Sequence, residues 1–144
     1  MPLTVEIVTA ERVVSSQEGA DEVVAPGMDG EFAVLPQHAA FITTLAPGEL
    51  RIITGDDEDA MAITGGFLEV YNDRIVVLAD AAERVEEIDV ARAEEAKRRA
   101  EESLREQRDV TDFVQTDAAL RRALARLRVA ERRGRRGRSG PPRA

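Results

Sequence analysis

The chain has 144 residues, no cysteine, and 28 acidic against 20 basic side chains, for a formal net charge of −8. This length allows one ordinary domain, or one small domain with an appendage. The lack of cysteine excludes a disulfide framework and a thiolate zinc site. The first residues show no signal peptide, and no stretch approaches the ~18 uninterrupted apolar residues of a membrane span. Any contact with a membrane is therefore expected to go through a partner.

The charge is unevenly distributed along the chain. The segment from Arg121 to Ala144 contains ten arginines and one acid, Glu131, which gives a charge of +9. The remainder carries −17, from ten basic and 27 acidic side chains. A basic end on an acidic body is typical of a segment that meets an anionic surface, or of a solvated disordered tail. The charge pattern leaves both alternatives open.

The first 85 residues are rich in Val, Ile, Thr and Gly, in short runs separated by turn formers. Such runs at close intervals, with no helical segments between them, predict an antiparallel β-sandwich or barrel rather than a parallel sheet. The candidate strands are LTVEIVT, RVVSS, DEVVA, EFAVLP, FITTL, LRIIT, AMAIT, FLEVY and RIVVLAD. Asp29-Gly30 fits a tight turn with positive φ, and Gly65-Gly66 fits a bulge or a close approach of two backbones.

After Glu87 the sequence becomes helical. IDVARAEEAKRRAEESLREQ contains no Gly or Pro and consists of good helix formers, with Asp89 as its N-cap. RDVTDFVQT breaks the pattern, so the second helix is expected to start at Thr116 or Asp117 and to end at Gly134. Residues 134–144 are expected to form a disordered basic tail.

The apolar stripes of the two helices are thin. They consist of Ile88, Ala96, Ala100 and Leu104 on the first helix, and Leu120, Ala123, Leu124, Leu127 and Ala130 on the second. Alanine buries little area, so at ~25 cal/mol per Å² this seam contributes much less than a leucine seam. Isolated helices of this length are marginal in water. The composition predicts a weakly held hairpin that can open.

The sequence lacks the residues of an enzyme site. His38 is the single histidine and is expected to be a turn or packing residue. The run Asp56–Asp59 lacks the spacing of an EF-hand and is expected to be a solvated turn. No nucleophile elbow, P-loop or GxGxxG motif is present, and four Phe and one Tyr leave little for stacking on bases. We therefore expect no catalysis, no metal, no required cofactor and no nucleic-acid partner.

Three stretches carry a resemblance to a known family: PGMDGEFAVLPQHAAFITTLAPGELRI from Pro26, ITGGFLEVYNDRIVVLAD from Ile63, and IDVARAEEAKRRAEESL from Ile88. In this order and spacing the chain resembles the epsilon subunit of bacterial F-type ATP synthases, which is the delta subunit in mitochondrial naming. Ala40 departs from the family's frequent proline, and the run from Arg132 to Ala144 extends past the usual family end.

The resemblance implies an α+β protein with a non-catalytic role in the rotor. Residues 1–85 would form a β-sandwich that binds the gamma subunit and the c-ring, with Met28 and Phe32 as candidate contacts and core packing as the favoured role of Phe32. Residues 86–133 would form a regulatory helical hairpin. The isolated chain would be a monomer, and in the complex it would lie at the cytoplasmic face of the bacterial cell membrane.

The resemblance also implies that the hairpin extends toward the alpha and beta subunits and inhibits ATP hydrolysis. Its candidate contacts are the arginines of the second helix: Arg121, Arg122, Arg126, Arg128, Arg132 and Arg133. A solvated face on a helix that stays docked is the alternative. An unrelated function is also open, namely a β-sandwich interaction module whose basic arm binds another acidic partner.

The stretch from Ile88 to Ala93 resembles the I/L-D-x-x-R-A signature of family members that bind ATP as a regulatory ligand. The candidate ligand residues implied by this resemblance are Glu83, Ile88, Asp89, Arg92, Ala93, Arg99, Arg122 and Arg126. Carboxylates can accept from adenine or ribose, and arginines from two helices can hold phosphates. The alternative is structural: Asp89 only caps the helix, and Arg92 and Arg99 only pair with helix acids such as Glu95.

Overall fold

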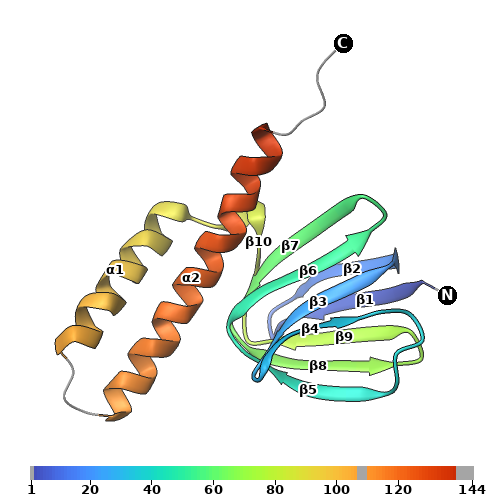
Figure 1. Ribbon diagram of the computed structural model, residues 1–144, viewed down its shortest axis with the longest axis horizontal. Coiled ribbons are helices and arrows are strands. Elements are labelled where there is room, and N and C mark those ends of the chain that lie inside the picture. The colour runs from blue at the N-terminus through green and yellow to red at the C-terminus, as the bar shows by residue number, and fades with distance from the viewer. Residues whose placement is uncertain (1, 107–109, 139–144) are drawn as a thin grey trace.

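A computed structural model describes residues 2–106 and 110–138 of the chain, and within the second helix the side chains of residues 113–132. The strands come first and the helices last; the two helices lie side by side, and α2 packs on the face of the strands β6 and β7 (Figure 1). The strands are β1 (Leu3–Val8), β2 (Val13–Ala20), β3 (Glu22–Gly27), β4 (Gly30–Val34), β5 (Phe41–Leu45), β6 (Gly48–Thr54), β7 (Asp57–Ile63), β8 (Gly66–Tyr71), β9 (Arg74–Ala79) and β10 (Ala82–Arg84). The helical elements are η1 (Val85–Glu87), α1 (Val90–Glu106) and α2 (Val110–Arg138).

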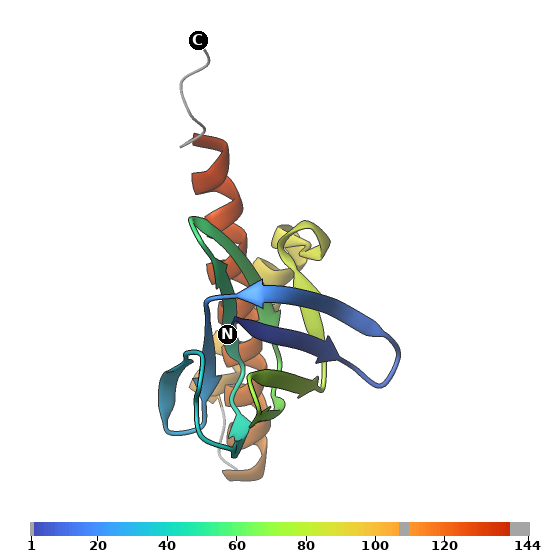
Figure 2. The ribbon, with the colours of Figure 1, turned by 90° about the vertical axis from the view of Figure 1, so that its right-hand side faces the viewer.

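The strands form one continuous sheet that folds over on itself (Figure 2). Their order is β10-β7-β6-β3-β5-β8-β9-β1-β2, and β4 pairs with β3 at the side of this path. All described strand pairs are antiparallel except β1 with β9. The predicted fold class, a β-sandwich followed by two helices, is confirmed.

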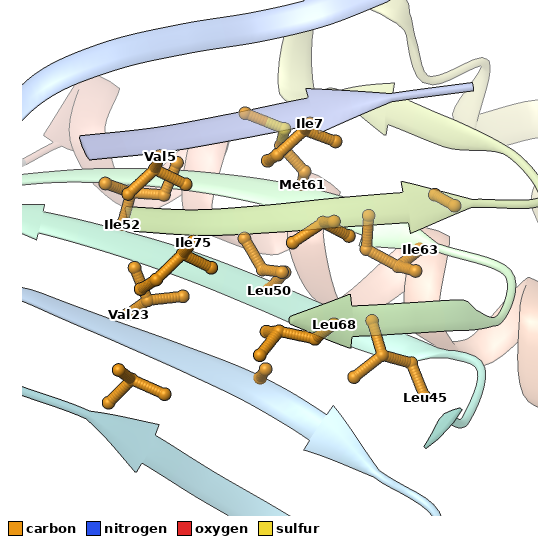
Figure 3. Packing of buried hydrophobic residues seen from close by; sticks show 14 of the residues in the cluster. Val5, Ile7, Val23, Leu45, Leu50, Ile52, Met61, Ile63, Leu68 and Ile75 are labelled. Carbon is orange, nitrogen blue, oxygen red and sulfur yellow. The ribbon is translucent and has the colours of Figure 1, made fainter. Parts of the chain in front are cut away.

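The sandwich core follows from the alternation of the strands. On β1, Leu3, Val5 and Ile7 are buried and the residues between them are half-buried, as expected for a period of two. Side chains from β1 and β9 point toward those of β6 and β7, and Leu50, Met61 and Ile75 are fully buried there (Figure 3). The core cluster runs from Leu3 to Ala82 and contains no residue of either helix.

Two glycine predictions are confirmed. Gly27 pairs with Gly30 across the two-residue turn at Met28 and Asp29, and Gly30 has φ of 128°. Gly66 has φ of 134°, and a Cβ at this position would lie 2.1 Å from the carbonyl oxygen of Leu78. The β8–β9 pair therefore requires glycine at position 66, because any side chain would displace the neighbouring backbone.

The first helix starts as predicted, and the second does not. Asp89 Oδ1 accepts a hydrogen bond of 3.1 Å from the backbone N–H of Arg92, so Asp89 caps α1. The predicted start of the second helix at Thr116 or Asp117 is wrong, because α2 begins at Val110. The intervening Thr, Asp and β-branched residues cost at most about 0.7 kcal/mol each relative to Ala, and neither Gly nor Pro interrupts them.

The predicted helix end at Gly134 is also wrong, since α2 continues to Arg138. A glycine inside a helix costs about 1 kcal/mol, and the arginines around Gly134 and Gly137 are good helix formers. Residues 139–144 of the predicted basic tail lie outside the described residues. No described helix is long and apolar enough to cross a bilayer.

Small residues dominate the seams of the hairpin. Ala93 and Ala100 of α1 and Ala123 of α2 are buried, whereas Leu124 is 40% exposed. On its other side α2 packs on β6 and β7. There a small second cluster contains Ala60, Ala62, Ile88 and Val129. The hairpin is thus docked on the sandwich through a small apolar contact, which leaves a large share of the attachment to polar groups.

Candidate functional site at the hairpin interface

A pocket of about 360 Å³ lies where β10, η1, α1 and α2 meet. Its walls come from both helices and from the end of the sandwich, so a ligand bound here would contact the sandwich and both helices. The lining residues are Glu83, Glu87, Asp89, Arg92, Ala93, Ala96 and Arg126. The structure therefore brings together five of the eight predicted ligand residues: Glu83, Asp89, Arg92, Ala93 and Arg126. The sequence prediction had missed Glu87 and Ala96.

The pocket contains one paired and one unpaired guanidinium group. Arg126 Nε lies 2.9 Å from both Oε1 and Oε2 of Glu83, and both side chains are about a quarter exposed. Arg92 is exposed and forms no ion pair with any described residue. Glu87 is paired with Arg12 at 2.7 Å. Arg92 is therefore a cation available to an anion, in a lining that also contains three carboxylates, two of which are already paired.

The other three predicted ligand residues lie elsewhere. Ile88 is 5% exposed and packs in the cluster under α2. Arg99 projects from the exposed side of α1 and pairs with Glu95 one turn earlier. Arg122 is half-buried on α2 and does not line the pocket. Asp89 caps its helix and also lines the pocket, so both roles considered for it fit its position. ATP binding at this pocket stays a prediction.

The six predicted inhibitory arginines have different environments in the docked state, in which Arg122 is half-buried. Arg126 and Arg132 contact carboxylates of the sandwich. Arg121 and Arg128 are exposed. The side chain of Arg133 lies outside the described residues. The predicted inhibitory arginines are therefore not equivalent, because two of them also hold the hairpin in place.

Arg132 binds the sandwich with all three of its guanidinium nitrogens. Nε and Nη2 lie 2.8 Å and 2.7 Å from the two oxygens of Glu49, and Nη1 lies 2.7 Å from Glu58. The hydrogen bond to Glu49 raises the pKa of Arg132 above its ordinary value, with smaller contributions from the charges of Glu49, Glu58 and Glu31. Arg132 thus remains charged throughout the physiological range. Sequence reasoning missed Glu49 and Glu58, because nothing in strands β6 and β7 indicates which helix residue covers them.

A second exposed surface lies on β5, β8 and β9, away from the strands that contact α2. Phe67 faces Leu78 across the β8–β9 pair, and each is 54% exposed. Ile42 on β5 and Tyr71 on β8 are 69% and 61% exposed. We call Ile42, Phe67, Tyr71 and Leu78 the apolar strand surface. Large apolar side chains gathered on one face usually mark a contact with a partner.

The two residues singled out near the first glycine turn have different environments. Met28 is 58% exposed, so it is available for contact. Phe32 packs against the sandwich core, and its ring lies edge-to-face with Phe41 at 5.8 Å. His38 is half-buried with its ring 5.7 Å from Phe41, which agrees with the predicted packing role.

The chain matches two family models along almost its whole length. Residues 2–85 match the ATP synthase delta/epsilon chain β-sandwich domain, and residues 86–131 match the long α-helix domain of the same chain. An ATP synthase epsilon chain of Dehalococcoides mccartyi is 55% identical over 133 residues, covering 91% of this chain and 94% of the relative. One of Herpetosiphon aurantiacus is 47% identical over 133 residues, covering 92% and 97%.

Solved structures show the same fold at lower identity. A chain of the Euglena gracilis mitochondrial ATP synthase, from a structure of OSCP, F1 and the c-ring, superposes with a TM-score of 0.77 at 22% identity, covering 90% of this chain and 81% of that one. A chain of the Tetrahymena thermophila mitochondrial ATP synthase central stalk and c-ring gives a TM-score of 0.67 at 12% identity, covering 90% and 97%.

Proposed function

Because the chain belongs to the ATP synthase delta/epsilon chain family, we propose that it is a non-catalytic subunit of the central stalk of a rotary ATP synthase. In this role it couples the ion-driven membrane ring to the catalytic head. It associates with the cytoplasmic face of the bacterial cell membrane through the complex. The observation that carries the proposal is the match of both family models, in order and without a gap, over residues 2–131. That match favours the central-stalk role over an unrelated interaction module.

The sandwich carries the assembly function in this proposal. Its apolar strand surface exposes Phe67 and Leu78 side by side, and Met28 is exposed at the nearby end of β3. A protein partner that covers these side chains gains the free energy of removing them from water. We assign the gamma subunit and the c-ring as the partners of the sandwich. The hairpin is attached to other strands and is dispensable for this binding.

The hairpin carries the regulatory function. It is docked here by small apolar seams and by arginines, so the free-energy difference between the docked and undocked states is small. When extended, α2 presents its arginines to acidic segments of the alpha and beta subunits and blocks ATP hydrolysis. The exposed Arg121 and Arg128 support this proposal, since they are charged groups without a described partner on the sandwich.

ATP serves as a regulatory ligand of the docked hairpin and is not hydrolysed. The pocket between β10, α1 and α2 provides Arg92 and Arg126 for the phosphates. It also provides Glu83 and Asp89 for the adenosine part. A ligand that contacts both helices binds only the docked state, and at 100 times its dissociation constant it stabilises that state by about 2.7 kcal/mol. Abundant ATP then releases the inhibition.

Co-purification with the gamma subunit tests the proposed assembly role. We expect the full chain to bind gamma, and Phe67→Asp to abolish binding because it places a charge within the apolar strand surface. Val13→Asp is the matched control, since Val13 is 57% exposed on β2 outside this surface. Equal binding by both variants would exclude the apolar strand surface. No binding by the unmodified chain would overturn the proposed function.

A further inference from the structure

Glu49 on β6 is a carboxylate in an unusual place. It points to the face of the sheet that α2 covers, and it is 7% exposed. Burying a carboxylate is costly unless its charge is paired and its oxygens accept hydrogen bonds. The docked hairpin covers Glu49, so a cation on the hairpin is well placed to compensate this charge.

Arg132 provides that charge in a two-pronged arrangement. Its Nε and Nη2 groups donate to the two different oxygens of Glu49, and Nη1 donates to Glu58 on the adjacent strand β7. This geometry uses the planar fork of a guanidinium fully, and a lysine could not reproduce it. The contact is therefore a specific binding site for an arginine rather than a general attraction between charges.

The neighbouring groups do not replace Arg132 when it leaves. Arg51 lies 3.1 Å from Glu31 and 3.4 Å and 3.6 Å from Glu49 and Glu58, so it is already shared among three carboxylates. With Arg132 present, two guanidinium groups serve these three acids. Without it, one guanidinium serves all three. Undocking of α2 thus raises the excess of negative charge in this group of β4, β6 and β7 side chains from one (three acids, two arginines) to two (three acids, one arginine).

This contact is separate from the candidate nucleotide pocket. Arg126 and Glu83 line the pocket, whereas Arg132, Glu49 and Glu58 do not. A nucleotide can compete with Glu83 for Arg126, but it has no direct access to Arg132. The hairpin therefore has a second attachment that does not depend on nucleotide.

We propose that Glu49 and Glu58 form an internal arginine-binding site that holds the hairpin on the sandwich without nucleotide and competes with acidic partners for Arg132. The competition with acidic partners for Arg132 rests on the proposed inhibitory function, whereas the internal site itself does not depend on that function. In the docked state all three guanidinium nitrogens of Arg132 contact Glu49 or Glu58, and extension of α2 toward another subunit carries Arg132 away from the sandwich, so it cannot bind both sets of carboxylates at once. Weakening the internal site must then favour the extended, inhibitory state, because the equilibrium shifts by the lost difference in affinity.

Thiol labelling of the isolated full-length chain tests the internal site. The chain has no cysteine, so Ala60→Cys introduces a single thiol at a position that is 4% exposed in the contact with α2. Maleimide reaches this thiol only when the hairpin undocks. Met61→Cys is the matched control, because Met61 is 0% exposed on the opposite face of β7 and reports unfolding of the sandwich.

We expect Arg132→Gln and Glu49→Gln, each combined with Ala60→Cys, to speed labelling about tenfold or more, as for the loss of a charge-assisted hydrogen bond. Labelling in the Met61→Cys background should not change. A nearby positive charge favours the reactive thiolate and a negative charge disfavours it. Through this effect alone, loss of Arg132 would slow the reaction of the thiol with maleimide, and loss of Glu49 would speed it. Faster labelling in both variants therefore reports exposure of the thiol. Combining both substitutions should label no faster than either alone. Arg128→Gln removes the same charge from an exposed position and should have no effect.

Equal rates for Arg132→Gln and Arg128→Gln, or fully additive effects of Arg132→Gln and Glu49→Gln, would overturn the internal site.

ATP hydrolysis by the assembled complex tests the competition. Glu49→Gln should lower hydrolysis because it releases Arg132, whereas Arg132→Gln should not. Equal effects of both variants would overturn the competition. No change in any hairpin variant would overturn the inhibitory function itself, while the labelling result would still decide the internal site.

Discussion

Arg126 on α2 and Glu83 on β10 are paired through Nε and both carboxylate oxygens at 2.9 Å, inside the pocket that the two helices share with the sandwich. The carboxylate of Glu83 is thus already bound to Arg126, the cation that we assign to a nucleotide phosphate. Arg92 on the opposite wall carries no such partner among the described residues. A bound phosphate chain would meet Arg92 directly and would have to displace Glu83 to reach Arg126.

Calorimetric titration of the full chain with ATP tests this arrangement. We expect Arg92→Gln and Arg126→Gln each to weaken binding about tenfold or more, because each removes a charge-assisted contact. Arg99→Gln should bind like the unmodified chain, since Arg99 lies outside the pocket and pairs with Glu95. The absence of saturable heat up to about 1 mM ATP would exclude the pocket as a sensor. A dissociation constant of about 1 mM corresponds to a binding free energy of only about −4 kcal/mol.

Glu83→Gln should separate the phosphate contacts from the adenosine contacts. The substitution releases Arg126, so tripolyphosphate, which has no adenosine, should bind the variant more tightly than the unmodified chain. ATP should gain less, because the variant also loses a carboxylate that accepts from the adenosine part. If tripolyphosphate binds both proteins equally, the Glu83–Arg126 pair does not compete with phosphate.

The sequence predicted the sandwich well because each strand carries its own signal. The alternation in LTVEIVT places Leu3, Val5 and Ile7 on one face without reference to the rest of the chain. The strand β10 was missed, because the three residues Ala82–Arg84 are too few to show the alternation of buried and exposed side chains that marks a strand. The early start of α2 was missed because propensity differences of ~0.5 kcal/mol per residue do not fix a helix boundary.

The candidate pocket was predicted only in part, for the same reason. Asp89, Arg92 and Ala93 form a local pattern that can be recognised in one stretch. Arg132 and Glu49 are 83 residues apart, and their pairing depends on how α2 lies across β6. No local pattern encodes such a distance. Arg99 shows the converse case, since it follows the helix spacing of the predicted site but its side chain is exposed and pairs with Glu95.

Gly66→Ala should unfold the sandwich at markedly lower urea concentration. The new Cβ would lie 2.1 Å from the carbonyl oxygen of Leu78, and φ of 134° is unfavourable for alanine. We expect a loss of at least about 3 kcal/mol in the free energy of unfolding, from backbone strain and overpacking together. Gly19→Ala is the control, because Gly19 has φ of 80° but open space around its Cα. It should cost only about 1–2 kcal/mol. Equal losses would show that the close contact with Leu78 is unimportant.

The fragment of residues 1–85 should fold without the hairpin. All members of its core cluster lie between Leu3 and Ala82, so truncation removes none of them. Circular dichroism should show a β-type spectrum and a single cooperative thermal transition. Leu50→Ala in the same fragment should cost about 2–5 kcal/mol, because Leu50 is fully buried. A disordered fragment would show that α2 is required for the stability of the sandwich.

The exposed arginines of α2 should carry the electrostatic part of the inhibition. Replacing the six predicted inhibitory arginines with alanine is expected to raise ATP hydrolysis by the assembled complex, but that variant also removes the docking contacts of Arg126 and Arg132. The combined Arg121→Ala and Arg128→Ala variant avoids this problem, since both side chains are exposed in the docked state. Hydrolysis should rise most at about 0.01 M ionic strength, where the Debye length is about 30 Å. Arg98→Ala with Arg105→Ala removes two charges from α1 and should leave hydrolysis unchanged. If the α2 pair also has no effect in low salt, the inhibitory contact does not depend on these charges.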